Sequence, residues 1–159
     1  MRFYTQGWMA MLNNIKDNIS MEKIARLLIA VGAIAHLIFN YVHTNALLLL
    51  EDQICGFIMF MFILVGLVTL FESTQIKEGK ATTKVITAIF CGITIFFGYK
   101  LVEIYRNAIA FQGSLSQTAP VQKAIVMSVV LMSIFAVAGI LLIIDSVRTK
   151  MRGKHEIDS

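Results

Sequence analysis

The sequence predicts an all-α integral membrane protein with four transmembrane helices and an amphipathic interfacial helix at the N-terminus. Apolar residues make up 57% of the 159 residues and charged residues only 15%, whereas a soluble domain carries about 25% charge. Four long apolar runs alternate with short polar segments. One run, residues 53–71, carries no charge over a length that crosses a hydrocarbon core. We therefore expect one membrane domain and no separate soluble domain.

Residues 1–20 have the pattern of an amphipathic helix. Trp8, Leu12, Ile15 and Ile19 recur at helical spacing, and polar residues occupy positions between them. A helix of this kind lies in the plane of the membrane interface, where Trp side chains are enriched. Packing of this helix on a partner subunit is the alternative.

The first span is predicted over about residues 24–49, inside a four-helix transmembrane domain. One face of this helix combines small and polar residues at helical spacing, namely Gly32, His36, Asn40 and His43. Polar groups that face lipid are costly, and small residues allow helices to approach closely. This face is therefore expected to contact other helices.

The remaining spans are predicted over residues 53–71, about 82–103 and about 121–144. Together with the first span they form a domain over residues 21–145, and residues 146–159 form a basic cytoplasmic tail. The candidates for helix contacts on these three spans are small or carry a hydroxyl group: Gly66, Thr87, Thr94, Gly98 and Gly139.

Helix is also expected to continue past the third span. The pair Glu103 and Arg106 has helical spacing, which predicts a surface segment that ends near Gln112. Residues 113–119 are predicted to form a polar loop. Pro120 follows it, and proline is tolerated in the first turn of a helix.

Lysine and arginine are distributed unequally between the two sides of the predicted domain. Of 14 such residues, only Lys100, Arg106 and Lys123 lie on one side, which leaves eleven for the other. The positive-inside rule then predicts a multi-pass protein of the cell (inner) membrane with both termini in the cytoplasm. Lys84 and Lys100, at the ends of the third span, are expected to extend to the interface.

Few residues could carry chemistry. His36 and His43 share a face but lie roughly 10 Å apart along the axis, so they cannot ligate one iron together. Each could ligate a haem if a second subunit supplied the other ligand. Hydrogen bonding across helices is the favoured interpretation. Cys55 and Cys91 form no CxxC pattern. We expect no metal site, no cofactor and no nucleic-acid binding, and without a nucleophile motif or phosphate loop the chain is not expected to be an enzyme.

Two stretches of the chain form a pattern of their own. YVHTNAL at 41–47 leads to Glu51 and Asp52 before an aromatic-rich span, and GYK at 98–100 precedes QTAPV at 117–121. In these stretches the chain resembles the small membrane subunit of tripartite ATP-independent periplasmic (TRAP) transporters. That resemblance implies a scaffold that braces a larger subunit, which would hold the substrate and sodium sites, and it implies no catalytic residue in this chain.

The chain also departs from that family's pattern. Asn40 stands where the family has Arg, Ala46 stands where it has Pro, and no Trp precedes Glu51. The Gly-His-Ile pattern that follows the family's second span is absent, and residues 76–79 read IKEG instead. These departures concern the motifs themselves, while length, span number and charge distribution agree with the family.

The functional hypothesis is a non-catalytic membrane subunit that packs in the lipid bilayer against a larger integral membrane subunit or against copies of itself. Its specific form is the small subunit of a sodium-driven organic-acid uptake transporter. One alternative is a haem-anchoring or accessory subunit of a membrane redox complex, with His36 and His43 as ligands. Another is a small self-assembling pore or holin-like protein.

Overall fold

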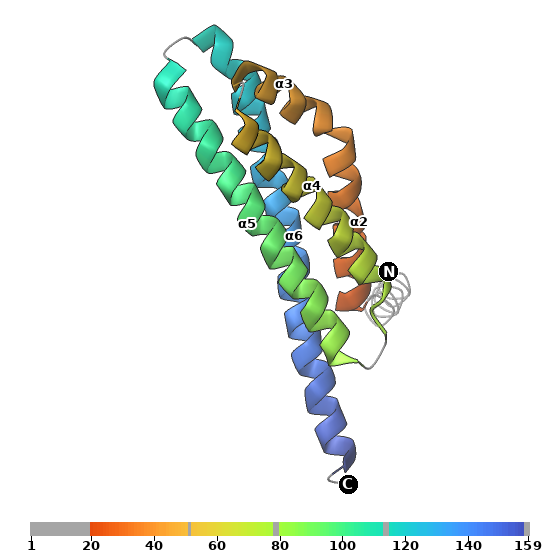
Figure 1. Cartoon of the computed structure of the whole chain (residues 1–159). Coiled ribbons are helices and arrows are strands. Elements are labelled where there is room, and N and C mark those ends of the chain that lie inside the picture. The colour runs from red at the N-terminus through yellow and green to blue at the C-terminus, as the bar shows by residue number, and fades with distance from the viewer. Residues whose placement is uncertain (1–19, 51, 78–79, 113–114, 158–159) are drawn as a thin grey trace, which may run out of the picture.

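The computed structural model describes residues 20–50, 52–77, 80–112 and 115–157. Within these residues the chain folds into helices and contains no strand, so the predicted all-α class is confirmed (Figure 1). The amphipathic helix predicted for residues 1–20 lies outside the described residues, apart from Ser20.

Five helices follow one another from residue 20 onward, in the part of the chain that the structure describes: α2 (Met21–Ile38), α3 (Asn40–Leu50), α4 (Gln53–Thr74), α5 (Ala81–Gln112) and α6 (Leu115–Ile157). By length and composition, α4, α5 and α6 can each cross a membrane, and α2 with α3 supplies a fourth span if the bent pair is counted as one. Four spans were predicted, at these places in the sequence.

The first span is not one straight helix, because it breaks at Phe39. Helix α3 is bent by 42° from α2. The backbone N–H of Phe39 donates to the carbonyl of Ala35 at 2.9 Å, as in an α-helix. The N–H of Val42 donates to the carbonyl of Phe39, three residues earlier, at 3.0 Å, and this second bond closes a tighter turn than an α-helix makes. Kinks usually occur at Pro or Gly, and neither stands here.

The helices form a ring around a packed interior. Helix α6 packs against α5 and α2, and α4 packs against the same two helices from the other side. Two apolar clusters fill the interior. One surrounds Phe62, Leu101 and Tyr105, and the other surrounds Ile29 and Phe135. The core therefore runs along the bundle and is divided between its two ends.

Helices α5 and α6 extend past their predicted spans. The continuation of the third span to Gln112 is confirmed. Residues 115–119, predicted as loop, are helical, and Pro120 lies inside α6 rather than in its first turn. The region from residue 146 is also helical, to Ile157. Lys and Arg are good helix formers, and in Figure 1 this end of α6 projects beyond the other helices.

Large apolar side chains cover the outside of the bundle on every helix. Examples on the four apolar spans are Leu27, Phe57, Phe96 and Val130, which are 65%, 63%, 54% and 50% exposed. A helix of a soluble protein presents a polar face to water. This surface suits hydrocarbon or another apolar helix instead.

Candidate functional site

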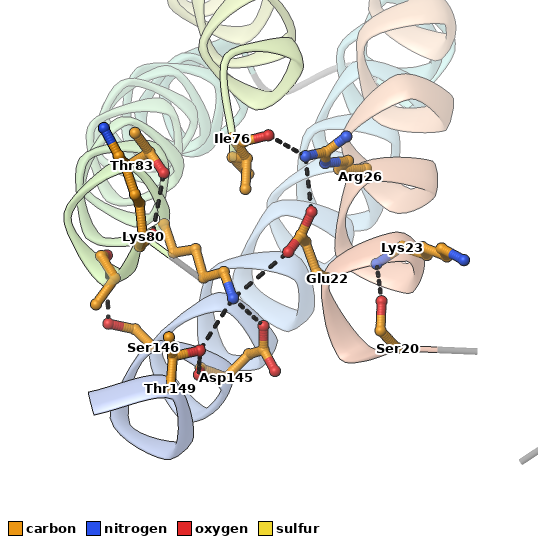
Figure 2. Close-up of polar contacts among 12 residues, drawn as sticks. Ser20, Glu22, Lys23, Arg26, Ile76, Lys80, Thr83, Asp145, Ser146 and Thr149 are labelled. Atoms are coloured by element: carbon orange, nitrogen blue, oxygen red, sulfur yellow. Dashed lines mark hydrogen bonds and ion pairs between the residues drawn. The ribbon is translucent and has the colours of Figure 1, made fainter. Parts of the chain in front are cut away.

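One end of the bundle contains a charged cluster of Glu22, Arg26, Lys84 and Asp145, with the Thr149 hydroxyl beside it. Figure 2 shows these polar contacts. The Lys84 ammonium donates to Asp145 Oδ2 at 2.6 Å and to Thr149 Oγ1 at 3.1 Å. It also lies 3.4 Å from Glu22 Oε2. A single lysine on α5 thus joins two carboxylates, one on α2 and one on α6.

A second cation extends the charged cluster to α4. Arg26 Nη2 lies 2.7 Å from Glu22 Oε1, and the same nitrogen donates to the backbone carbonyl of Ile76, just after α4. Arg26 Nε is buried and has no hydrogen-bond partner among the described residues. The charged cluster therefore links segments from all four sides of the ring and pairs two acids with two bases.

The position of Lys84 differs from the prediction. We expected its side chain to reach the interface, but it is only 4% exposed and points into the bundle. The reason is that Asp145 and Glu22 supply negative charge there, and a buried ammonium is stable when it is paired and hydrogen-bonded. Lys100 lies at the surface as expected, 43% exposed and 2.8 Å from Glu103 Oε2.

The sequence holds a weak signal for this cluster. Glu22 and Arg26 stand four residues apart at the start of the first span, which is the spacing of a helical ion pair. Asp145 ends the last apolar run. Nothing in the sequence indicates that Lys84, 61 residues before Asp145, would lie between these two carboxylates.

His36 lies in the middle of the bundle, among aromatic rings. Its imidazole is fully buried, with the Phe62 ring edge-on at 4.3 Å between centroids and the Phe135 ring at 5.7 Å. A Cβ added at Gly66 would lie 3.0 Å from His36 Cδ2, so the glycine makes room for the ring. Neither ring nitrogen of His36 has a hydrogen-bond partner within the described part of the chain.

His43 joins α3 to α5 through Tyr105. Its Nδ1 lies 3.1 Å from the Tyr105 hydroxyl, and the tautomer decides which atom donates. The two rings are nearly parallel, at 15° and 6.1 Å between centroids. The sequence favours the interpretation that the histidines of the first span hydrogen-bond across helices. His43 makes such a bond, and His36 does not among the described residues.

The four candidate glycines all lie where another side chain approaches closely. A Cβ at Gly32 would meet Phe135 at 3.0 Å, and one at Gly139 would meet Cys91 at 3.2 Å. Gly98 is the tightest, with Met132 Cγ at 2.7 Å from such a Cβ. Together with Gly66, these positions are helix contacts within the chain itself.

The remaining candidates fall into three situations. Thr94 lies 3.2 Å from the hydroxyl of Thr69 and so links α5 to α4. Thr87 is buried but bonds only to a carbonyl of its own helix. Asn40 is exposed, although its spacing with His36 predicted the inner face. Asn40 comes directly after the break at Phe39, where the helix changes direction.

The described side chains form no cluster of metal ligands. They contain no group of three or more His, Cys, Asp or Glu residues that could hold a metal ion. Cys55 and Cys91 are free thiols buried in different apolar clusters. Two hollows of the described surface are open depressions, one of about 390 Å³ beside Glu103 and Arg106 and one of about 370 Å³ beside Asp52 and Asn107.

The fold and the two polar centres define an all-α bundle of apolar helices that is compatible with a multi-pass membrane protein. His36, His43 and Lys84 are buried, and large apolar side chains cover much of the surface. Comparison with known proteins adds no family to this class, since no family model, curated protein or solved structure matches the chain.

Proposed function

We propose that this chain is a non-catalytic subunit of the cell inner membrane that packs against a larger integral membrane protein and braces it. The specific version, which rests on the TRAP-like stretches, is the small subunit of a sodium-driven organic-acid uptake transporter. Both termini then lie in the cytoplasm, because most Lys and Arg residues gather at the end of the bundle where α2 begins and α6 ends, and the positive-inside rule places such an end in the cytoplasm.

The observation that carries this proposal is a glycine without an internal reason. Gly32, Gly66, Gly98 and Gly139 each accommodate a neighbour inside the bundle. A Cβ added at Gly92 would meet no atom within 4 Å, which is also true of Gly56 and Gly153, but Gly92 lines an apolar hollow between α5 and α6. Glycine in a helix interior costs about 1 kcal/mol relative to alanine. An external helix that approaches closely would give Gly92 the role that the other four have internally.

Gly92 lies in a groove between α5 and α6, which we call the α5–α6 groove. The groove has a small volume, about 200 Å³, and its lining is almost wholly apolar. Small residues and Ile side chains contribute most of its lining, among them Ala88, Gly92, Ile95, Ala136, Gly139 and Ile140. The shape and chemistry suit an apolar transmembrane helix of a partner.

The packed interior supports a bracing role over the alternatives. The rings of Phe62 and Phe135 fill the space beside His36, so a porphyrin has no room there, which disfavours the haem-anchoring subunit. A pore through a single chain would need a polar passage, and the two apolar clusters fill most of the described interior, so a pore would have to form between copies of the chain. A rigid, filled bundle is what a supporting subunit requires.

The test is co-purification in mild detergent after co-expression with the neighbouring genes of its genome. We expect the wild-type chain to retain a larger membrane protein, and Gly92→Leu to lose it by filling the α5–α6 groove. Gly56→Leu is the matched control, because a Cβ at Gly56 also meets nothing within 4 Å but lies on α4. A stable monomer without a partner, or equal retention by both variants, would overturn the proposal.

A further inference from the structure

The end of the bundle that holds the charged cluster also carries a group of exposed cations. Inside, Glu22 and Asp145 are paired with Arg26 and Lys84 and leave no net charge. Outside, among the described side chains, only Glu72 adds an acid at this end, and it is half-buried. The exposed cations, which we call the basic end, are Lys23, Lys77, Lys80, Arg148, Lys150, Arg152 and Lys154.

The opposite end of the bundle is nearly neutral by comparison. It carries Lys100, Arg106 and Lys123, but Lys100 is paired with Glu103 at 2.8 Å and Asp52 adds a further carboxylate. The positive potential is therefore concentrated at one end, where a surface of anionic groups would be attracted most strongly.

In a bilayer whose hydrocarbon core ends where the other helices end, the projecting part of α6 would carry its cations into the headgroup layer. Ser146 donates to the carbonyl of Ala81, the first residue of α5, and Thr149 still contacts Lys84, so the other helices end near this level. Beyond it, α6 rises ~1.5 Å per residue, which puts Lys150 and Lys154 about 2 and 8 Å further out. The headgroup layer is roughly 5–8 Å thick on each side of a bilayer.

Apolar side chains stand directly beside these cations. Val147 and Met151 are 48% and 63% exposed. With Lys150 and Lys154 they line a shallow, mostly apolar depression of about 230 Å³. A free phosphate ion would gain nothing from this apolar pair, whereas the glycerol and upper acyl region of a lipid would cover it. The combination favours an amphiphile with a negative headgroup.

We propose that the basic end binds anionic phospholipids by their phosphate headgroups, with Lys150, Arg152 and Lys154 as principal contacts. This inference rests on the membrane location in the proposed function but does not involve the partner subunit. Each Lys or Arg near an anionic surface strengthens binding about fivefold. Removing three should weaken it by at least about tenfold, and by up to about a hundredfold if the effects add.

The experiment uses the full chain in nanodiscs of mixed phosphatidylglycerol and phosphatidylcholine, with lipids retained by the protein counted by native mass spectrometry. We expect wild-type protein to enrich phosphatidylglycerol, and the triple variant K150Q/R152Q/K154Q to lose that enrichment. The matched control K100Q/R106Q/K123Q removes the same charge from the opposite end and should retain it. Equal enrichment in both variants, or none in the wild type, would overturn the proposal.

Two further arms keep the result interpretable. If the triple variant does not fold, the wild type alone is measured at about 50 and 500 mM salt, where screening should reduce the enrichment severalfold. Unchanged enrichment at high salt counts against the proposal. Inorganic phosphate added at millimolar concentration should not displace the lipid, and displacement would show that the end binds phosphate rather than phospholipid. Neither arm depends on a partner subunit, so the bracing function is tested separately.

Discussion

Replacing Lys84 by Met should destabilise the bundle more than the replacement of any other lysine that the structure describes. The ammonium is 4% exposed and has Asp145 at 2.6 Å and Glu22 at 3.4 Å. Removing one partner of a buried ion pair costs about 3–5 kcal/mol, because the other charge stays buried and unpaired. Glu22 keeps Arg26, and Asp145 is 20% exposed, so we expect the lower end, about 3 kcal/mol.

The free energy of unfolding can be measured by SDS titration in dodecyl maltoside, followed by far-UV circular dichroism. Lys80→Met is the matched control, because Lys80 is exposed and lies just before α5, four residues before Lys84. Surface substitutions usually change stability by less than about 0.5 kcal/mol. The double variant of Lys84→Met with Asp145→Leu should recover much of the loss, since an apolar replacement of a buried pair is often neutral. A loss below about 1 kcal/mol for Lys84→Met would show that its charge lies in water.

Substitutions at Gly98, Gly92 and Tyr105 test the packing and one hydrogen bond of the bundle. Gly98→Ala should destabilise the protein by about 1–3 kcal/mol, because the new Cβ would lie 2.7 Å from Met132 Cγ. Gly92→Ala should be neutral or stabilising, because the space around its new Cβ is open. Heating followed by size-exclusion chromatography ranks the stabilities of the two variants, and the reverse order would refute the packing described at these glycines. Tyr105→Phe leaves His43 Nδ1 without its partner and should cost about 1 kcal/mol in the same assay, so full stability would show that the hydrogen bond contributes nothing.

The fold class could be predicted because the lipid environment imposes a simple rule on sequence. Backbone groups in hydrocarbon must be satisfied within the helix, so a span must be long and apolar. Residues 53–71 meet that rule without a charge, and they lie within α4. The four candidate glycines could also be predicted to form helix contacts, because small residues allow close approach. Which side chain fills each gap could not be predicted.

The break at Phe39 and the charged cluster could not be predicted, for different reasons. No Pro or Gly marks the break, so local sequence carries no signal of it. Asn40, directly after it, consequently lies outside rather than on the expected face. The charged cluster depends on contacts between residues far apart, such as Lys84 and Asp145, and helical spacing says nothing about those.

The polar contacts inside the bundle explain how the apolar outside can remain available to a partner. Hydrophobic burial does not drive helices together in lipid, so specific contacts must set their register. Here Thr69 and Thr94 join α4 to α5, and His43 and Tyr105 join α3 to α5. Lys84 joins α5 to both α2 and α6. Because these internal contacts fix the register, the apolar outer surface, including the α5–α6 groove, is not needed to hold the bundle together and can serve a partner helix.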